Sequence, residues 1–255
     1  MNKLKQSINN GELTLGSWLQ LPDVFSAEIM AKSGFDWLAI DMEHGLIDIA
    51  SAFRLIQVIG LTGVAPLVRL NTNDPSTIRR VMDAGAQGVI VPMVNSAHDA
   101  QLAADAVYYA PKGDRSFGLG RAHEFGNKFE EYIEVANADS VLVVQIEHID
   151  AVSNLDAILK VQGIDAIIIG PYDLSGSMGI PGKFNDSKFQ DEINSIVEKV
   201  KKYKIALGIH IVRPSTVDYE TRIKQGFRFI GFGIDTIYLS ENSAMAVKQC
   251  RERQK

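Results

Sequence analysis

Two acidic residues, Glu147 and Asp173, each come shortly after an apolar run, Val141–Ile146 and Ala166–Ile169 respectively. If the two runs are neighbouring parallel strands, both carboxylates lie at the same end of the sheet and can converge on one ion. Carboxylate oxygens with no cysteine nearby suit a hard divalent cation such as Mg²⁺ or Mn²⁺. Waters or substrate oxygens would complete the octahedral coordination of the cation. Either residue could instead cap the helix that follows it, so a metal site and two helix caps are alternatives.

Two more polar residues lie at the C-terminal ends of predicted strands. They would add a general base and a positive charge to the proposed metal site. His44 follows Trp37–Asp41, and an imidazole there could act as a general base near neutral pH, with Asp41 and Asp83 as candidate partners that orient it. Arg69 follows apolar residues, so its guanidinium should face a carboxylate of the protein or of a substrate. A surface histidine and a purely structural ion pair are the alternative interpretations.

A divalent cation, an arginine beside a keto oxygen and a base form a set that could stabilise the enolate of a 2-oxo acid. The cation and the guanidinium lower the cost of negative charge on the carbonyl oxygen when a C3 proton leaves or a C3–C4 bond breaks. No lysine ends any predicted strand, so the nucleophile of a Schiff-base aldolase is missing. The sequence therefore favours metal-assisted chemistry on a 2-oxo acid.

The elements that would position these residues are short apolar runs that alternate with helix-period segments. Most of the runs are continuously apolar, which is typical of parallel strands covered on both faces. The predicted strands are Leu15–Leu19, Trp37–Asp41, Ala65–Leu70, Gly88–Pro92, Val141–Ile146, Ala166–Ile169, Ala206–Ile211 and Phe229–Phe232. Eight β-then-α units in 255 residues predict a single-domain (β/α)8 TIM barrel over residues 1–255. An open doubly wound sheet is the alternative, but its G-x-G-x-x-G turn is missing from the first 60 residues.

Local signals mark where the helices begin and end. The predicted start signals are Asp23, Asp48, Asp74 and either Asn95 or Ser96. The predicted left-handed glycine ends are Gly34, Gly60, Gly85, Gly163 and Gly226. Two long connections, Ala110–Tyr132 and Gly170–Phe184, are expected to reach the C-terminal end of the barrel, where the active sites of barrel enzymes lie.

The composition excludes several classes of protein. The chain is 46% hydrophobic with a net charge of −5, which argues against disorder and against nucleic acid or an anionic membrane as a partner. Its single cysteine, Cys250, allows no internal disulfide and no cysteine-based zinc site. Residues 1–18 lack the apolar core of a signal peptide, and no apolar run reaches the length of a membrane span. We expect a soluble, cytoplasmic protein that acts on small molecules.

Five segments match the motifs of a known family. They are Phe35–His44, Pro66–Arg69, Val91–Val94, Gln145–Glu147 and Ile169–Ser175. In this order, within a likeness that runs from about Leu15 to Asp235, they resemble the HpcH/HpaI aldolases, which are metal-dependent class II pyruvate aldolases. The resemblance implies a (β/α)8 barrel whose last helix is exchanged between subunits, and a hexamer built as a trimer of dimers. It also implies reversible cleavage of a 4-hydroxy-2-oxo acid to pyruvate and an aldehyde.

The resemblance also implies roles for residues on the pyruvate side. By position, Glu147 and Asp173 would bind the divalent metal, which would be Mg²⁺ or Mn²⁺, with Co²⁺ as a third candidate. Arg69 would contact the pyruvyl oxygen. The backbone amides of Gly170 and Tyr172 would hold the substrate carboxylate.

The resemblance implies that His44, supported by Asp83 and Asp41, is the acid/base. Two other functions stay open beside the aldolase. Lyases of malyl-CoA or citryl-CoA thioesters share the barrel and the enolate chemistry, but they need basic groups for the CoA phosphates, and no basic cluster stands out beside the predicted strand ends. A barrel that binds a 2-oxo acid without catalysis would not need His44.

The aldehyde side departs from the family's pattern. Tyr172 occupies a position where a small residue is common, and His210 ends the seventh predicted strand where an apolar residue is common. We hypothesise that His210 or Arg121 contacts a polar aldehyde. Trp18, at the end of the first predicted strand, is a further candidate for substrate binding.

Overall fold

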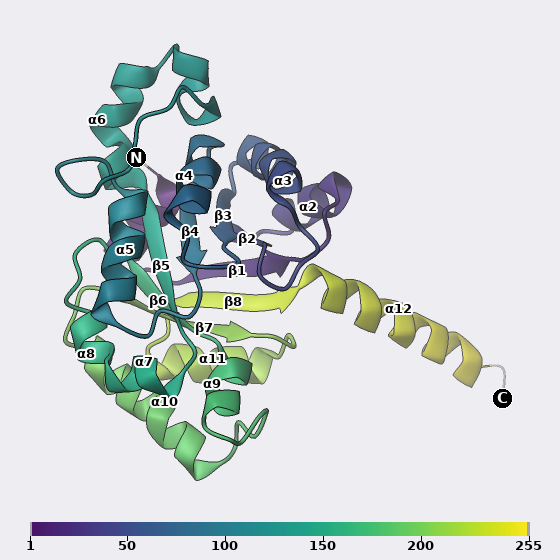
Figure 1. Cartoon of the computed structure of the whole chain (residues 1–255). Helices are drawn as coiled ribbons and strands as arrows, with labels where there is room; N and C mark the ends of the chain where they lie inside the picture. The colour runs from purple at the N-terminus through teal and green to yellow at the C-terminus, as the bar shows by residue number, and fades with distance from the viewer. Residues whose placement is uncertain (1, 254–255) are drawn as a thin grey trace.

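The computed structural model describes residues 2–253, which contain a closed barrel of eight parallel strands (Figure 1). The strands are β1 (Thr14–Leu19), β2 (Trp37–Asp41), β3 (Ala65–Arg69), β4 (Gly88–Val91), β5 (Val141–Ile146), β6 (Ala166–Ile169), β7 (Ala206–Ile211) and β8 (Phe229–Ile234). Each strand pairs with the next, and β8 closes the barrel on β1. The predicted barrel is confirmed. Of the domain predicted over residues 1–255, Met1, Gln254 and Lys255 lie outside the described residues.

Helices precede, connect and follow the strands. They are α1 (Lys3–Asn9), α2 (Val24–Ala31), α3 (Ile49–Thr62), α4 (Pro75–Asp83), α5 (Ala97–Val107), the 3₁₀ helix η1 (Arg121–Gly126), α6 (Phe129–Asp139), α7 (Ile149–Ser153), α8 (Leu155–Ile158), α9 (Pro171–Ser177), α10 (Ser187–Val200), α11 (Thr216–Gln225) and α12 (Asp235–Glu252). The side chains of Asp23, Asp48, Asp74 and Ser96 each accept a hydrogen bond from a backbone N–H in the first turn of α2, α3, α4 and α5. The predicted starts are confirmed, with Ser96 and not Asn95 as the cap.

Four of the five predicted glycine ends have the expected conformation. Gly34, Gly85, Gly163 and Gly226 have left-handed φ angles between a helical segment and the next strand, where glycine reverses the chain without a steric cost. The prediction for Gly60 was wrong. Gly60 lies inside α3, and the left-handed residue that ends this helix is Gly63, three residues later.

Large aromatic rings fill the interior of the barrel below its C-terminal end. Trp37 stacks on Phe229 at 4.4 Å between ring centroids and meets the edge of Trp18 at 5.4 Å. Gly16 is required beside them, because a Cβ there would lie 1.9 Å from the Trp37 ring. The buried apolar residues of α1, Leu4 and Ile8, belong to the same interior cluster. This core supports the strand ends, above which a pocket opens.

The two long connections lie at opposite ends of the barrel. Gly170–Phe184 lies at the C-terminal end, as predicted, and carries α9. The prediction for Ala110–Tyr132 was wrong. Helix α5 runs back along the barrel, so the segment that leaves it begins at the N-terminal end, where Arg121 Nη1 donates to the Ala84 carbonyl at the end of α4 at 3.2 Å.

Helix α12 projects away from the barrel (Figure 1). Its buried residue is Asp235, in the first turn, whose carboxylate accepts hydrogen bonds from the backbone of Gln20 and Leu21. Residues 239–253 are exposed, including the apolar side chains of Leu239 and Met245. In residues 2–253, no helix is long and apolar enough to cross a membrane.

Candidate active site

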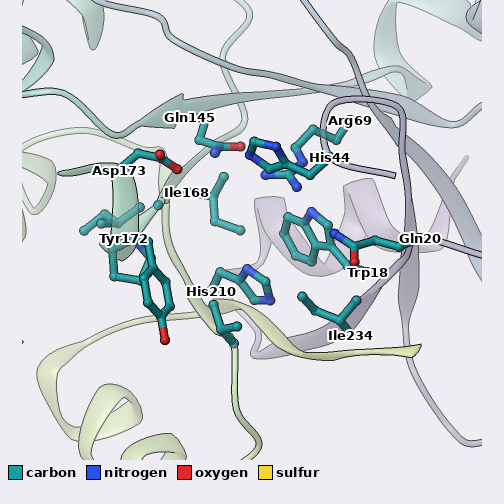
Figure 2. A pocket seen from close by; sticks show the side chains of 14 residues that line it. Trp18, Gln20, His44, Arg69, Gln145, Ile168, Tyr172, Asp173, His210 and Ile234 are labelled. Atoms are coloured by element: carbon teal, nitrogen blue, oxygen red, sulfur yellow. The ribbon is translucent and has the colours of Figure 1, made fainter. Parts of the chain in front are cut away.

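A pocket of about 310 Å³ opens at the C-terminal end of the barrel (Figure 2). Its lining includes seven residues predicted from the sequence, Trp18, His44, Arg69, Gly170, Tyr172, Asp173 and His210, together with Gln20 and Gln145. They meet because strand residues alternate between the two faces, so that every second residue points into the barrel. On β5, for example, Val143 belongs to the interior cluster and Gln145 lines the pocket, and Glu147 comes directly after the strand.

Arg69 is fixed by a two-bond ion pair with Asp41. The two residues are register partners on β3 and β2, and Arg69 Nε and Nη2 donate to the two Asp41 oxygens at 2.9 and 2.7 Å. Gln20 Nε2 adds a hydrogen bond at 3.0 Å. Burial acts to raise the pKa of Asp41, but the hydrogen bond and charge of Arg69 outweigh it and hold that pKa below its usual value. The expectation that Arg69 faces a carboxylate is confirmed. Asp41 uses two of the five guanidinium N–H groups, which leaves others for the pocket.

The His44 loop is held through its backbone. Asp41 Oδ1 accepts hydrogen bonds from the backbone N–H groups of Glu43 and His44, both at 3.1 Å, so Asp41 positions the loop and does not contact the imidazole. The carboxylate within reach of the ring is that of Glu43, whose Oε2 lies 3.9 Å from His44 Nε2 and 3.1 Å from Arg69 Nη1. Burial raises the pKa of Glu43; Arg69 opposes this shift, and the charges of Asp41 and Asp173 add to it. Glu43 lies in the same motif as His44, but no role was predicted for it.

Glu147 is 2% exposed and is held by two hydrogen bonds. Its Oε1 accepts from the Met93 backbone N–H at 2.7 Å, and its Oε2 accepts from Gln145 Nε2. Burial raises the pKa of Glu147 to about 7; these two hydrogen bonds oppose the shift, and the charges of Glu43 and Asp173 add to it. Gln145 Oε1 is buried and has no hydrogen-bond partner within residues 2–253. Gln145 is thus a positioning residue whose amide oxygen still faces the pocket.

Asp173 is placed by the turn from β6 into α9. Gly170 comes directly before this helix, and a Cβ there would lie 2.8 Å from Glu147 Oε2, so glycine allows the close approach of β6 to β5. Figure 2 shows the Asp173 carboxylate turned toward Gln145. The Gly170 N–H donates to the Ile146 carbonyl at 3.3 Å, whereas the Tyr172 N–H lies in the first turn of α9, where no earlier helical carbonyl is available.

The donor chemistry at this site fits a divalent cation. Glu43, Glu147 and Asp173 gather negative charge, with Arg69 as the facing cation. No group of three His, Cys, Asp or Glu side chains in the described part of the chain could hold an ion alone. Glu147 and Asp173 instead offer two hard oxygen donors and leave the remaining positions to water or substrate. A bound cation would also relieve the repulsion that contributes to the raised pKa of Glu147.

His210 forms part of an aromatic wall. Its ring stacks on Trp18 at 4.3 Å and 11°, and the Arg69 guanidinium lies 5.5 Å from the Trp18 ring. Burial lowers the pKa of His210 to about 3, with the Arg69 charge adding to the shift. His210 is therefore neutral near pH 7 and can offer a substrate a hydrogen bond but no charge.

Two residues predicted for the site lie at the other end of their own barrel. Asp83 ends α4 and forms an ion pair with the buried Arg115 at 2.6 Å. Arg121 bonds to the nearby Ala84 carbonyl. Because α4 starts at the C-terminal end of β3 and runs back along the barrel, its last residue cannot reach His44 of the same subunit. The expected support of His44 by Asp83, and the aldehyde contact of Arg121, are wrong within one subunit.

Comparison with known proteins shows the family. The profile of the HpcH/HpaI aldolase/citrate lyase family matches residues 14–241, which span the whole barrel. The chain belongs to this family. It is 36% identical to the 4-hydroxy-2-oxo-heptane-1,7-dioate aldolase of Salmonella typhimurium, over 95% of this chain and 92% of that protein. It is 35% identical to the 2-keto-3-deoxy-L-rhamnonate aldolase of Salmonella gallinarum, over 94% of this chain and 90% of that protein.

The fold agrees with this assignment. A crystal structure of a HpcH/HpaI aldolase/citrate lyase family protein from Burkholderia cenocepacia superposes with a TM-score of 0.93 at 28% identity, covering 98% of this chain and 100% of that one. The predicted membership of the family and the predicted carbon–carbon lyase class are confirmed. The two aldolase relatives are named for different substrates at nearly equal identity, so overall identity does not select the aldehyde.

Proposed function

We propose that this protein is a metal-dependent aldolase that reversibly cleaves a 4-hydroxy-2-oxo acid to pyruvate and an aldehyde. The observation that carries the proposal is that Asp173 and Arg69 line one pocket, and that the buried Glu147 lies near enough for the Asp173 charge to act on it, in a chain whose relatives are named aldolases. Glu147 and Asp173 would hold Mg²⁺ or Mn²⁺, with Co²⁺ as a third candidate. When bound, the cation supplies Lewis-acid charge that lowers the cost of negative charge at the C2 oxygen.

The chain's own residues would orient the substrate and move its proton. Arg69, locked by Asp41, directs its free N–H groups at the C2 oxygen, and the Tyr172 N–H binds the substrate carboxylate. In cleavage, His44 takes the proton of the 4-hydroxyl group. The C3–C4 bond then breaks, its electron pair moves into the enolate of pyruvate, and the aldehyde carbonyl forms. Protonated His44 then gives its proton to C3 of the enolate, which yields pyruvate and restores the neutral imidazole.

Exchange of the C3 hydrogens of pyruvate in D₂O tests this proposal without an aldehyde. We expect NMR to detect exchange that needs a divalent metal and stops with EDTA. We expect His44→Ala to slow it by at least roughly 10²-fold, the usual contribution of a general base. His98→Ala, on α5, is the matched control and should exchange like the wild type.

Pyruvate exchange and an assay of malyl-CoA cleavage also test the two alternative functions, a non-catalytic 2-oxo acid binding protein and a thioester lyase. Exchange that is missing from the wild type under all metal conditions would contradict the aldolase and favour a barrel that only binds a 2-oxo acid. Cleavage of malyl-CoA in preference to 4-hydroxy-2-oxo acids would favour a thioester lyase. A thioester lyase is not expected, because Arg69 is the one Lys or Arg that lines the pocket among residues 2–253, which leaves no basic cluster for the CoA phosphates.

The exposed helix α12 supports the proposed assembly, a hexamer built as a trimer of dimers in which α12 packs on a neighbouring subunit. An isolated helix of this length is marginal in water, and its own barrel leaves apolar side chains uncovered, among them Phe25 and Ile29 of α2. The cytoplasmic location expected from the sequence stays a prediction.

Removal of residues 239–255 should abolish the oligomer. Analytical ultracentrifugation should give a mass near six chains for the full protein and near one for the truncated protein. Lys248→Gln, an exposed change within α12, is the matched control and should leave the mass unchanged. A truncated protein that keeps the full mass would show that α12 does not hold the subunits together.

A further inference from the structure

Gln20 connects the active-site pocket to the beginning of helix α12. It follows β1 directly and lines the pocket. Figure 2 shows Gln20 and Trp18 at the same edge of the pocket. Thr236, in the first turn of α12, lies outside the pocket lining. A hydrogen bond between the side chains of Gln20 and Thr236 therefore joins a pocket residue to a residue behind it.

The backbone around Gln20 is fixed by Asp235, the first residue of α12. Asp235 is buried, and its two carboxylate oxygens accept hydrogen bonds from the backbone N–H groups of Gln20 and Leu21, both at 3.0 Å. The backbone N–H of Thr236 donates to the same carboxylate at 2.7 Å. These three bonds tie the end of β1 to the first turn of α12, so the Gln20 side chain starts from a fixed backbone.

The orientation of the Gln20 amide follows from its two neighbours. Its Nε2 donates to Asp41 Oδ2 at 3.0 Å, and its Oε1 accepts from Thr236 Oγ1 at 3.3 Å. An ionised carboxylate only accepts hydrogen bonds, so the NH2 end of the amide must face Asp41. The carbonyl end then faces Thr236, whose hydroxyl can donate to it. In a flipped amide, Gln20 Oε1 and Asp41 Oδ2 would face each other without a proton between them.

Gln20 completes the hydrogen bonding of Asp41, which is fully buried. Asp41 Oδ1 accepts from Arg69 Nε and from two backbone N–H groups of the His44 loop. Asp41 Oδ2 accepts from Arg69 Nη2 and from Gln20. Without the Gln20 amide, Oδ2 would lose one of its two bonds. A carboxylate that is short of donors can turn toward water in the pocket, and the Arg69 guanidinium would turn with it.

We propose that Gln20 is a positioning residue of the active site and that Thr236 sets the orientation of its amide. Together they hold the Asp41 carboxylate in the plane that points the remaining N–H groups of Arg69 into the pocket. The inference rests on the proposed aldolase function and deepens it, because it adds two residues that act on the enolate through Arg69. The alternative is that Gln20 and Thr236 only join β1 to α12.

Exchange of the C3 hydrogens of pyruvate in D₂O, with Mg²⁺ present, tests these contacts. Thr236→Val keeps the shape of the side chain and removes the hydroxyl, so the rate of exchange should fall roughly three- to tenfold, as expected for one lost hydrogen bond. Gln20→Met removes the amide and should cause a loss at least as large. Thr236→Ser keeps the hydroxyl and should stay within about twofold of the wild type. Thr221→Val, on the exposed surface of α11, is the matched control and should exchange like the wild type.

The Arg69→Lys variant shows whether the effect passes through Arg69. Lysine has already lost the fork that Gln20 helps to hold, so adding Thr236→Val to Arg69→Lys should not slow exchange further. Thr236→Val should also have no further effect in Gln20→Met, because Thr236 acts on Asp41 through that amide. Structural damage at the junction of β1 and α12 would instead slow exchange by the same factor in the wild type and in Arg69→Lys.

Three results would overturn the inference and leave the aldolase function intact. The first is wild-type exchange in either Thr236→Val or Gln20→Met. The second is an equal loss in Thr236→Ser and Thr236→Val, because the hydroxyl would then not be the group that matters. The third is the same fold loss from Thr236→Val with and without Arg69→Lys. A wild type that does not exchange pyruvate hydrogens overturns the aldolase function, and the inference with it.

Discussion

Glu147→Gln should abolish the metal-dependent reaction while the protein stays folded. The change keeps the size of the side chain and removes one of the two proposed anionic oxygen ligands. We expect kcat/KM for aldol cleavage to fall by at least about 10³-fold, which corresponds to about 4 kcal/mol of transition-state stabilisation. Calorimetric titration with Mn²⁺ should show the accompanying loss of metal affinity.

The stability of the metal-free protein distinguishes this effect from misfolding. Burial raises the pKa of Glu147 to about 7 from the model-peptide value of 4.5, so the folded state binds a proton that the unfolded chain has lost. This contribution to stability is present at low pH and disappears as the pH rises through about 7. At pH 8 the ionised carboxylate opposes folding, and the neutral glutamine should leave the metal-free Tm unchanged or higher.

Two matched variants complete the experiment. Asp173→Asn should lose activity to a similar degree, because it removes the other oxygen ligand. Glu131→Gln makes the same change as Glu147→Gln on the exposed surface of α6 and should keep full activity. If Glu147→Gln retains wild-type kcat/KM and binds Mn²⁺ normally, the proposed metal site is wrong.

The barrel could be predicted because each of its signals is local. Continuous apolar runs such as Ala166–Ile169 mark strands that helices cover on the outside, and capping residues such as Asp48 mark the helix starts between them. Gly60 shows the limit of such signals. It is followed by a second glycine, Gly63, three residues later, and only the packing of the last turn of α3 decides which of the two ends the helix.

Site residues could be predicted from the sequence where their position at a strand end determines their role. They could not be predicted where the role depends on side-chain contacts. Arg69 and Asp41 end adjacent strands in register, so their pairing follows from the barrel itself. Glu43 and Gln145 received no role, because their importance comes from contacts with His44, Arg69 and Glu147 that spacing alone does not reveal.

Asp83 and the segment 110–132 were misplaced for one shared reason. Both follow a helix and not a strand, and a helix that follows a strand carries the chain back to the N-terminal end of the barrel. Asp83 ends α4, and the segment leaves α5. Only residues that follow a strand lie at the C-terminal end of the barrel, where the site is. Support of His44 by Asp83 stays a prediction, and it requires Asp83 of a neighbouring subunit in the proposed oligomer.

Arg69→Lys should remove most of the activity although it keeps the positive charge. The guanidinium donates to both Asp41 oxygens, lies 3.1 Å from Glu43 and still offers N–H groups to the pocket. One ammonium cannot hold Asp41 in a two-bond fork and reach the C2 oxygen of the substrate as well. We expect kcat/KM to fall by about 10²–10³-fold, the usual loss when one oxyanion-stabilising donor is removed.

Stability and metal binding show where the effect arises. Arg69→Met would leave the buried Asp41 charge without its partner, so we expect a loss of about 3–5 kcal/mol in the free energy of unfolding. Arg69→Lys should lose less, because an ammonium still neutralises that charge. Arg228→Lys, at the N-terminal end of the barrel, is the matched control and should keep kcat within about twofold.

The contrast between the two arginine variants separates positioning from charge. If the charge of Arg69 alone stabilised the enolate, lysine would retain most of the activity and methionine would lose it. If the fixed fork is required, both variants should be nearly inactive, while Mn²⁺ affinity in Arg69→Lys stays close to that of the wild type. The bidentate geometry on Asp41 favours the second outcome, since it leaves the guanidinium one orientation in which its remaining N–H groups face the pocket. Wild-type kcat/KM in Arg69→Lys would contradict this role.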